Sequence, residues 1–134
     1  MKILIVYYSF SGTTKSVAET IALLTDGDLF ELIPETEYDF SDNTTLGRIR
    51  NGMASGYCPS LIGNLPVVAD YDVIFIGSPN WLKTFAPPAL SFLQGADLIG
   101  KTVIPFCTHG GGGFGHMVRD LREVCPNSHF KEGL

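Results

Sequence analysis

Residues 3–14, "ILIVYYSFSGTT", join a short apolar run to a loop that carries several hydroxyl side chains around one glycine. An apolar run without polar alternation is typical of a strand that is covered on both faces of a parallel sheet. Gly12 supplies the permissive backbone that a turn needs, but turning the chain does not require so many hydroxyls. We therefore expect this loop to hold a ligand through four hydroxyl residues, Ser9, Ser11, Thr13 and Thr14.

Two more apolar runs of the same kind follow, "DVIFIG" at residues 72–77 and "KTVIPFC" at residues 101–107. Strands are also predicted at residues 28–33 and 128–133. Between the strands, apolar residues recur at helical spacing. This spacing predicts four helices, which follow Thr13, span about 44–54, span 86–94 and follow Gly115. The alternation predicts a single α/β domain over residues 1–134, with a doubly wound parallel sheet and helices on both of its faces.

Composition narrows the class of protein. The formal net charge of -5 and the pI near 5.0 argue against nucleic-acid binding, which needs a basic surface. No apolar run reaches the roughly eighteen residues that a membrane span needs. Three cysteines without paired spacing, Cys58, Cys107 and Cys125, fit a reducing compartment. We therefore expect a cytoplasmic protein that binds neither nucleic acid nor membrane.

The first loop has the features of an anion site. In open α/β sheets, ligands bind beyond the carboxyl ends of the strands. The loop runs into a helix N-terminus, whose free N–H groups and dipole attract anions, and its hydroxyls add neutral donors. A terminal monophosphate is the expected ligand. The alternative is that Thr13 or Ser11 only caps the helix, which would account for one hydroxyl.

A second loop, "GSPNWLKTFAPP", follows the third predicted strand and contains the only tryptophan, Trp81. A tryptophan just beyond a parallel strand is well placed to cover a flat ring. The alternative is a core residue, which is the usual environment of a single tryptophan in a small domain.

A third loop, "THGGGGFGHM", follows the fourth predicted strand. Four consecutive glycines are costly in backbone entropy, so a bare turn does not explain them, whereas close approach of backbone amides to a ligand does. The GxGxxG pattern of Gly110, Gly112 and Gly115 is discounted as a dinucleotide fingerprint, because too little chain follows it to complete that unit.

Taken together and in order, these three segments resemble the flavodoxin family over essentially the whole chain. The resemblance implies a five-stranded sheet of order 2-1-3-4-5 that binds FMN without a covalent bond. It implies phosphate contacts from the first loop and ring contacts from the other two. The implied cofactor-binding residues are Ser9, Phe10, Ser11, Gly12, Thr13, Thr14, Ser78, Pro79, Asn80, Trp81, Leu82, Thr108, His109, Gly110, Gly111, Gly112, Gly113 and Phe114.

The sequence departs from the family pattern in two places. Many members have an aromatic residue in the last loop that stacks on the flavin, whereas here the loop is glycine-rich and Phe114 is the nearest substitute, so one flavin face is expected to be open. The chain also stops at Leu134, without the last helix of the family. We therefore expect exposed apolar surface near Val17, Ile21 and Leu24, covered by a second subunit or a separate chain unless the sequence is a fragment.

Three functions remain open at this point. The first is a one-electron carrier between redox partner proteins, and the second is an FMN-dependent reductase of a small acceptor such as a quinone. The third is a non-redox module that binds a phosphate compound or a protein. The sequence shows no convincing catalytic set, because Cys107 is expected to be a buried small hydrophobe and His109 either a flavin-edge donor or a solvated loop residue. Cys107 and His109 are also too few for a zinc site.

Overall fold

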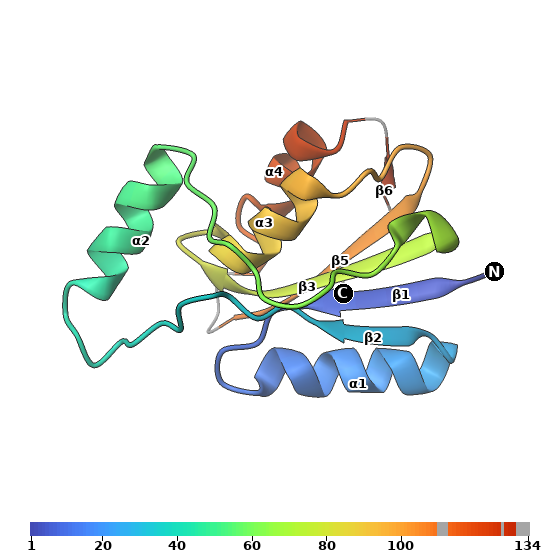
Figure 1. The fold of residues 1–134 in the computed structure, drawn as a ribbon, viewed down its shortest axis with the longest axis horizontal. Coiled ribbons are helices and arrows are strands. Elements are labelled where there is room, and N and C mark those ends of the chain that lie inside the picture. The colour runs from blue at the N-terminus through green and yellow to red at the C-terminus, as the bar shows by residue number, and fades with distance from the viewer. Residues whose placement is uncertain (110–112, 127, 131–134) are drawn as a thin grey trace.

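The computed structural model describes residues 1–109, 113–126 and 128–130. Its sheet contains five parallel strands in the order β2-β1-β3-β5-β6 (Figure 1). Counted among themselves, these strands have the predicted order 2-1-3-4-5. Their bounds are Ile3–Tyr7 (β1), Asp28–Glu31 (β2), Val73–Trp81 (β3), Thr102–Thr108 (β5) and His129–Phe130 (β6).

The four predicted helices are present in the described residues. They are α1 (Thr13–Thr25), α2 (Thr45–Ala54), α3 (Pro87–Gly95) and α4 (Met117–Val124). The prolines at the start of α3 fit its first turn, where their missing N–H groups cost no intrahelical bond. A short 3₁₀ turn over Val68–Asp70 (η1) precedes β3.

The two faces of the sheet bury two apolar cores, because successive side chains of a strand point to opposite faces. Leu4 and Val6 of β1 face the larger core, which α3 and α4 cover, and Ile5 and Tyr7 face the smaller core under α1. Figure 1 shows the same layers, with α1 on one side and α3 and α4 on the other. The predicted doubly wound arrangement is therefore confirmed for these three helices.

Two features differ from the expectations. Helix α2 lies apart from the sheet (Figure 1), so it does not form part of a layer in the way that the alternating pattern suggested. In α1, Ile21 is buried against the sheet, contrary to the expectation of exposed surface around it. Leu24 is exposed as expected, at 79%, and its neighbour Leu23 is 84% exposed.

An antiparallel hairpin at the end of β3 was not predicted. β3 continues to Trp81 and pairs with β4 (Thr84–Phe85) through a two-residue turn of Leu82 and Lys83. Both turn residues have positive φ, 54° and 72°. Tight hairpins normally place glycine or asparagine at such positions, so this sequence gave no hairpin signal.

No helix in the described part of the chain combines the length and the apolarity that crossing a bilayer requires.

Candidate functional site

The hydroxyl loop after β1 is organised by Ser9. Its Oγ accepts hydrogen bonds from the backbone N–H groups of Gly12 at 3.1 Å and of Lys15 at 3.2 Å. Gly12 has φ 95°, a left-handed conformation in which a side chain would be strained, so the glycine is required by the turn. The loop therefore has a defined shape that brings it to the first turn of α1.

Helix α1 begins at Thr13, and the capping position before it is Gly12, which has no side chain that could cap the helix. The alternative that Thr13 or Ser11 caps this helix is therefore wrong, and the two hydroxyls lie 3.3 Å from each other instead. Among the described residues, no hydrogen bond is made to the N–H groups of Thr13 and Thr14. Free amides at a helix start, with the dipole behind them, form a site for an anion.

The first and third loops meet at Thr14 and Thr108. Thr14 is 2% exposed, and its hydroxyl lies 2.8 Å from that of Thr108 at the end of β5. This contact fixes the start of α1 against the strand that leads into the glycine-rich loop.

The second and third loops also meet. The Asn80 amide donates to the carbonyl of Gly113 at 2.7 Å, and the Cys107 thiol lies 3.6 Å from the same oxygen. The backbone N–H of His116 donates to Lys83, and the Thr84 hydroxyl donates to Asp120. These bonds fasten the chain after Gly113 to the β3–β4 hairpin.

Several of the predicted site residues are buried or hydrogen-bonded within the protein. Ser78 is fully buried, and its hydroxyl accepts from the Ala86 N–H and donates to the Pro79 carbonyl, both at 2.8 Å. Burial raises the pKa of Cys107, which argues against a reactive thiolate. Phe114 is partly buried against the larger core. Gly110, Gly111 and Gly112 lie outside the described residues.

Trp81 forms an aromatic cluster with four other rings. Its ring centroid lies 5.6 Å from Tyr8, 5.7 Å from Phe10, and 5.2 Å from both Tyr38 and Phe40. All four contacts are edge-to-face, so none of these rings lies parallel to the indole. Trp81 is half-buried and packs against the larger core, while Phe10 and Phe40 are 48% and 40% exposed. The cluster therefore joins Trp81 to the first loop and remains open to solvent at its edge.

Sequence reasoning missed Tyr8, Tyr38 and Phe40. The close repeat of aromatic residues in "YDF" at residues 38–40 was the available signal, but nothing in the sequence places this loop beside Trp81. Burial, with smaller contributions from Tyr57 and Cys58, raises the pKa of Tyr38 to about 12. The pKa of Tyr8 is also raised, chiefly by burial and then by Tyr38 and Glu37. Both phenols are therefore protonated donors at neutral pH.

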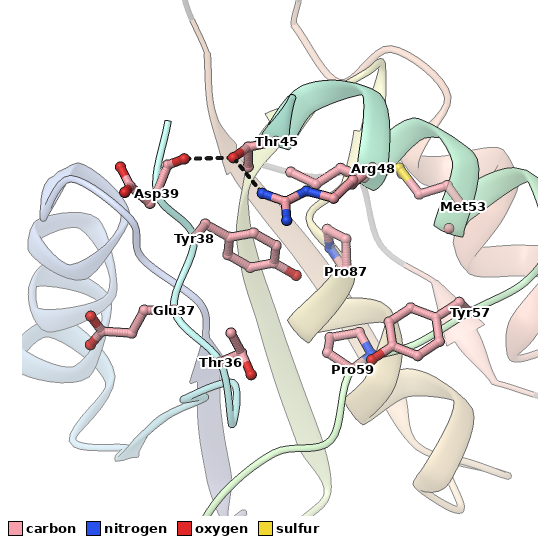
Figure 2. Close-up of a pocket in the computed structure, with 12 residues that line it drawn as sticks. Thr36, Glu37, Tyr38, Asp39, Thr45, Arg48, Met53, Tyr57, Pro59 and Pro87 are labelled. Atoms are coloured by element: carbon pink, nitrogen blue, oxygen red, sulfur yellow. Dashed lines mark hydrogen bonds between the residues drawn. The ribbon is translucent and has the colours of Figure 1, made fainter. Parts of the chain in front are cut away.

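A pocket of about 240 Å³ lies beside this cluster, between the loop of residues 36–39, α2 and Pro87 (Figure 2). Another cavity, of about 270 Å³, lies next to the hydroxyl loop and is lined in part by Tyr8, Ser9 and Phe10. Glu37 and Tyr38 line both, so the loop of residues 36–39 lies between this cavity and the pocket under α2.

Comparison with known proteins agrees with this geometry. A family model described as flavodoxin matches residues 2–134. A crystal structure from Bacteroides eggerthii DSM 20697, of a protein provisionally described as a flavoprotein, is 34% identical, with a TM-score of 0.87 over 98% of this chain and 86% of that one. No curated protein sequence matches this chain.

Two structures of flavoprotein from Lactobacillus acidophilus NCFM are each 28% identical and cover 98% of this chain. The complex with FMN has a TM-score of 0.84 over 91% of that chain, and the apo-form has a TM-score of 0.70 over 90%. This chain is therefore more similar in backbone to the FMN complex than to the apo-form.

Proposed function

The chain belongs to the flavodoxin family, and from this premise we propose that it binds FMN at the ends of β1, β3 and β5 and carries electrons between redox proteins. The observation that carries the proposal is the linkage of the three strand ends. Thr14 binds Thr108, Asn80 binds Gly113, and Trp81 contacts Tyr8 and Phe10. A ligand that touches all three loops is what this arrangement can accommodate.

The first loop suits the phosphate of FMN. Its donors are the free N–H groups at the start of α1 and the neutral hydroxyls of Ser11 and Thr13, which lie exposed at the loop surface. Ser9 would hold the shape of the loop rather than bind the phosphate itself, because its Oγ already accepts hydrogen bonds from two backbone amides. Uncharged donors together with a helix dipole bind phosphate without a metal ion.

The second and third loops suit the flat ring. Trp81 offers an indole surface at the mouth of the site, and the partly exposed rings of Phe10 and Phe40 lie around it. Bound FMN supplies the redox chemistry, so the chain's own task is to bind the flavin, orient it and limit its contact with water. The raised pKa of Cys107 is consistent with a site that uses no thiolate.

Backbone similarity supports the same ligand. The structure has a higher TM-score to the Lactobacillus acidophilus flavoprotein complex with FMN than to the apo-form.

An FMN titration tests the proposal. Trp81 is the only tryptophan, so its emission reports the strand-end site directly, and we expect added FMN to quench it and to lose its own fluorescence. Replacing Ser9 with Ala should weaken FMN binding by about tenfold, because two loop amides lose their acceptor and the loop loses its shape. Ser16→Ala, on the exposed side of α1, is the matched control and should leave the affinity within about twofold.

The titration has a clear negative outcome. If saturating FMN changed neither the Trp81 emission nor the flavin spectrum, the proposed function would be wrong. If Ser9→Ala and Ser16→Ala had equal effects on the affinity, the proposal of FMN binding would stand, but the assignment of the phosphate to the first loop would be wrong.

A second candidate function is an FMN-dependent reductase of a small acceptor such as a quinone. The observation that favours it is the pocket of about 240 Å³, which shares Glu37 and Tyr38 with the cavity next to the hydroxyl loop. Stopped-flow oxidation of the reduced protein by NAD(P)⁺ and by quinones, compared with transfer to a redox protein, distinguishes the two functions. Fast oxidation by a small molecule that saturates with concentration indicates the reductase, and slow, unsaturable oxidation indicates the carrier.

A further inference from the structure

We propose that the pocket between the loop of residues 36–39, helix α2 and Pro87 is a second binding site, for a planar aromatic anion. None of its lining residues belongs to the three loops that the sequence assigns to the cofactor. Binding there does not depend on the proposed FMN function, although any role of the ligand as an electron acceptor would rest on it.

The walls of the pocket favour a flat, apolar body. Figure 2 shows the ring of Tyr38 extending from its loop toward Pro87, and the ring of Tyr57 reaching from the other side toward Pro59. Ile49 and Met53 of α2 also line the pocket. Aromatic and proline rings give broad flat contacts to a planar ligand. The volume of about 240 Å³ is small for a ligand pocket, which restricts the ligand to one or two fused rings.

The polar groups around this body are donors. The Tyr38 and Tyr57 hydroxyls make no hydrogen bond within the part of the chain that the structure describes, and the raised pKa of Tyr38 keeps its proton in place. Figure 2 shows the guanidinium of Arg48 directed toward Tyr38, whereas the carboxylates of Glu37 and Asp39 point away from that ring. The ligand must therefore supply acceptor oxygens rather than donors.

The one basic side chain that lines the pocket offers a contact for an anion. Among the described residues that line it, Arg48 alone is basic. Its Nη2 lies 3.1 Å from the Thr45 hydroxyl and 3.4 Å from a carboxylate oxygen of Asp42. The Arg48 and Asp42 side chains are 67% and 45% exposed, so this ion pair is weak and a bound carboxylate can replace it. The planar fork of arginine then matches the ligand carboxylate with two parallel hydrogen bonds.

The two acidic residues of the lining do not oppose such a ligand strongly. The Asp39 carboxylate accepts hydrogen bonds from the Ser41 N–H and hydroxyl, which lower its pKa and hold it outside the pocket. Glu37 is exposed to solvent, where its charge is screened. Neither carboxylate is directed at the ring of Tyr38, toward which the Arg48 guanidinium is directed.

Calorimetric titration with 2-naphthoate tests the site, on the full chain with and without FMN. We expect binding in both cases, and we expect 2-naphthamide, which lacks the charge, and cyclohexanecarboxylate, which lacks the flat ring, to bind at least about tenfold more weakly. Arg48→Gln should weaken 2-naphthoate binding by about tenfold or more and leave 2-naphthamide binding unchanged.

The chain provides a matched control for that variant. Arg50 lies two positions further along α2, on the opposite side of the helix, and it is exposed and does not line the pocket. Arg50→Gln should change the affinity for 2-naphthoate by less than about twofold. Tyr38→Phe removes one donor and should weaken binding by about threefold to tenfold. Asp42→Asn removes the competing carboxylate and should strengthen binding.

The outcomes separate cleanly. No binding of 2-naphthoate, equal binding of 2-naphthamide, or equal effects of Arg48→Gln and Arg50→Gln would overturn the proposal. If 2-naphthoate bound as expected while FMN did not bind at all, the second site would stand and the proposed function would fall. If 2-naphthoate binding were abolished by FMN, the ligand would occupy the strand-end site and the proposal would be wrong.

Discussion

The hydroxyl oxygens of Thr14 and Thr108 lie 2.8 Å apart, although 94 positions separate the two residues along the chain. This hydrogen bond connects the first turn of α1 to the last residue of β5. Thr14 is 2% exposed, whereas Thr108 is half-buried. The bond therefore joins a hydroxyl that water cannot easily reach to one that it can.

The unequal burial of the two threonines leads to the first prediction. Thr14→Val leaves a hydroxyl at Thr108 that water can satisfy, so it should lower the free energy of unfolding by about 1 kcal/mol. Thr108→Val leaves the buried Thr14 hydroxyl without a partner, so it should cost more, about 1–3 kcal/mol. The double variant should cost less than the sum, because both ends of the bond are then apolar. Urea unfolding of the wild type, the two single variants and the double variant measures these losses of stability. A loss in the double variant equal to the sum of the two single losses would contradict the prediction.

Gly12 and Gly77 are required for different physical reasons, and this leads to the second prediction. A Cβ at Gly77 would lie 2.1 Å from the buried ring of Phe106, whereas a Cβ at Gly12 would contact nothing within 4 Å and only the φ of 95° is unfavourable. Gly12→Ala should therefore cost about 1–2 kcal/mol, from backbone strain. Gly77→Ala should cost about 3 kcal/mol, from overpacking.

A second substitution separates the two causes. Phe106→Leu should recover part of the loss in Gly77→Ala, because it removes the ring that the new methyl group meets. The same substitution should only add to the loss in Gly12→Ala. Recovery in both backgrounds, or in neither, would show that the cause assigned to Gly77 is incorrect.

Much of the fold could be predicted because its signals are local. The apolar runs at β1, β3 and β5 identified strands buried on both faces, and the residues that pair β1 with β3 fall within them. The start of α1 after Gly12 and the start of α3 at its prolines follow from turn and helix chemistry that a few residues carry. The hydroxyl loop was recognisable for the same reason.

The rest depends on contacts between distant segments. Helix α2 has an amphipathic pattern, but its sequence does not say that it lies apart from the sheet. The aromatic cluster brings Tyr38 and Phe40 to Trp81 through the path of a loop, which no short pattern encodes. The β3–β4 hairpin turns at Leu82 and Lys83, residues that a sequence reader does not associate with positive φ.

That strained turn leads to the third prediction. Lys83 is exposed and has φ 72°, and glycine adopts this conformation without penalty. Lys83→Gly should therefore raise the free energy of unfolding by up to about 1 kcal/mol. This is the gain from relieving the backbone strain less the entropy cost of ordering glycine, which is more flexible in the unfolded chain. Lys83→Ala is the control, because it removes the same side chain and keeps the strain. Thermal unfolding compares the two, and an alanine variant as stable as the glycine variant would rule out strain at this position.

The buried phenols beside Trp81 give the fourth prediction, on the dependence of stability on pH. Burial raises the pKa of Tyr38 from 10.0 in the unfolded chain to about 12 in the folded protein. The folded state therefore holds the phenol proton at pH values where the unfolded state has lost it. This contribution to stability is fully present below pH 10 and is lost as the pH rises through about 12, so alkali should unfold the protein.

Urea midpoints at pH 9 and at pH 11 measure this effect in the wild type and in Tyr38→Phe. Phenylalanine keeps the ring contacts with Trp81 and Tyr8 but has no proton to lose, so the midpoint of the variant should fall less between the two pH values. Tyr8→Phe should behave in the same way, because the pKa of Tyr8 is also raised chiefly by burial. Equal falls in all three proteins would show that the phenols are as accessible to water in the folded state as in the unfolded one, and that the aromatic cluster opens far more readily than its packing implies.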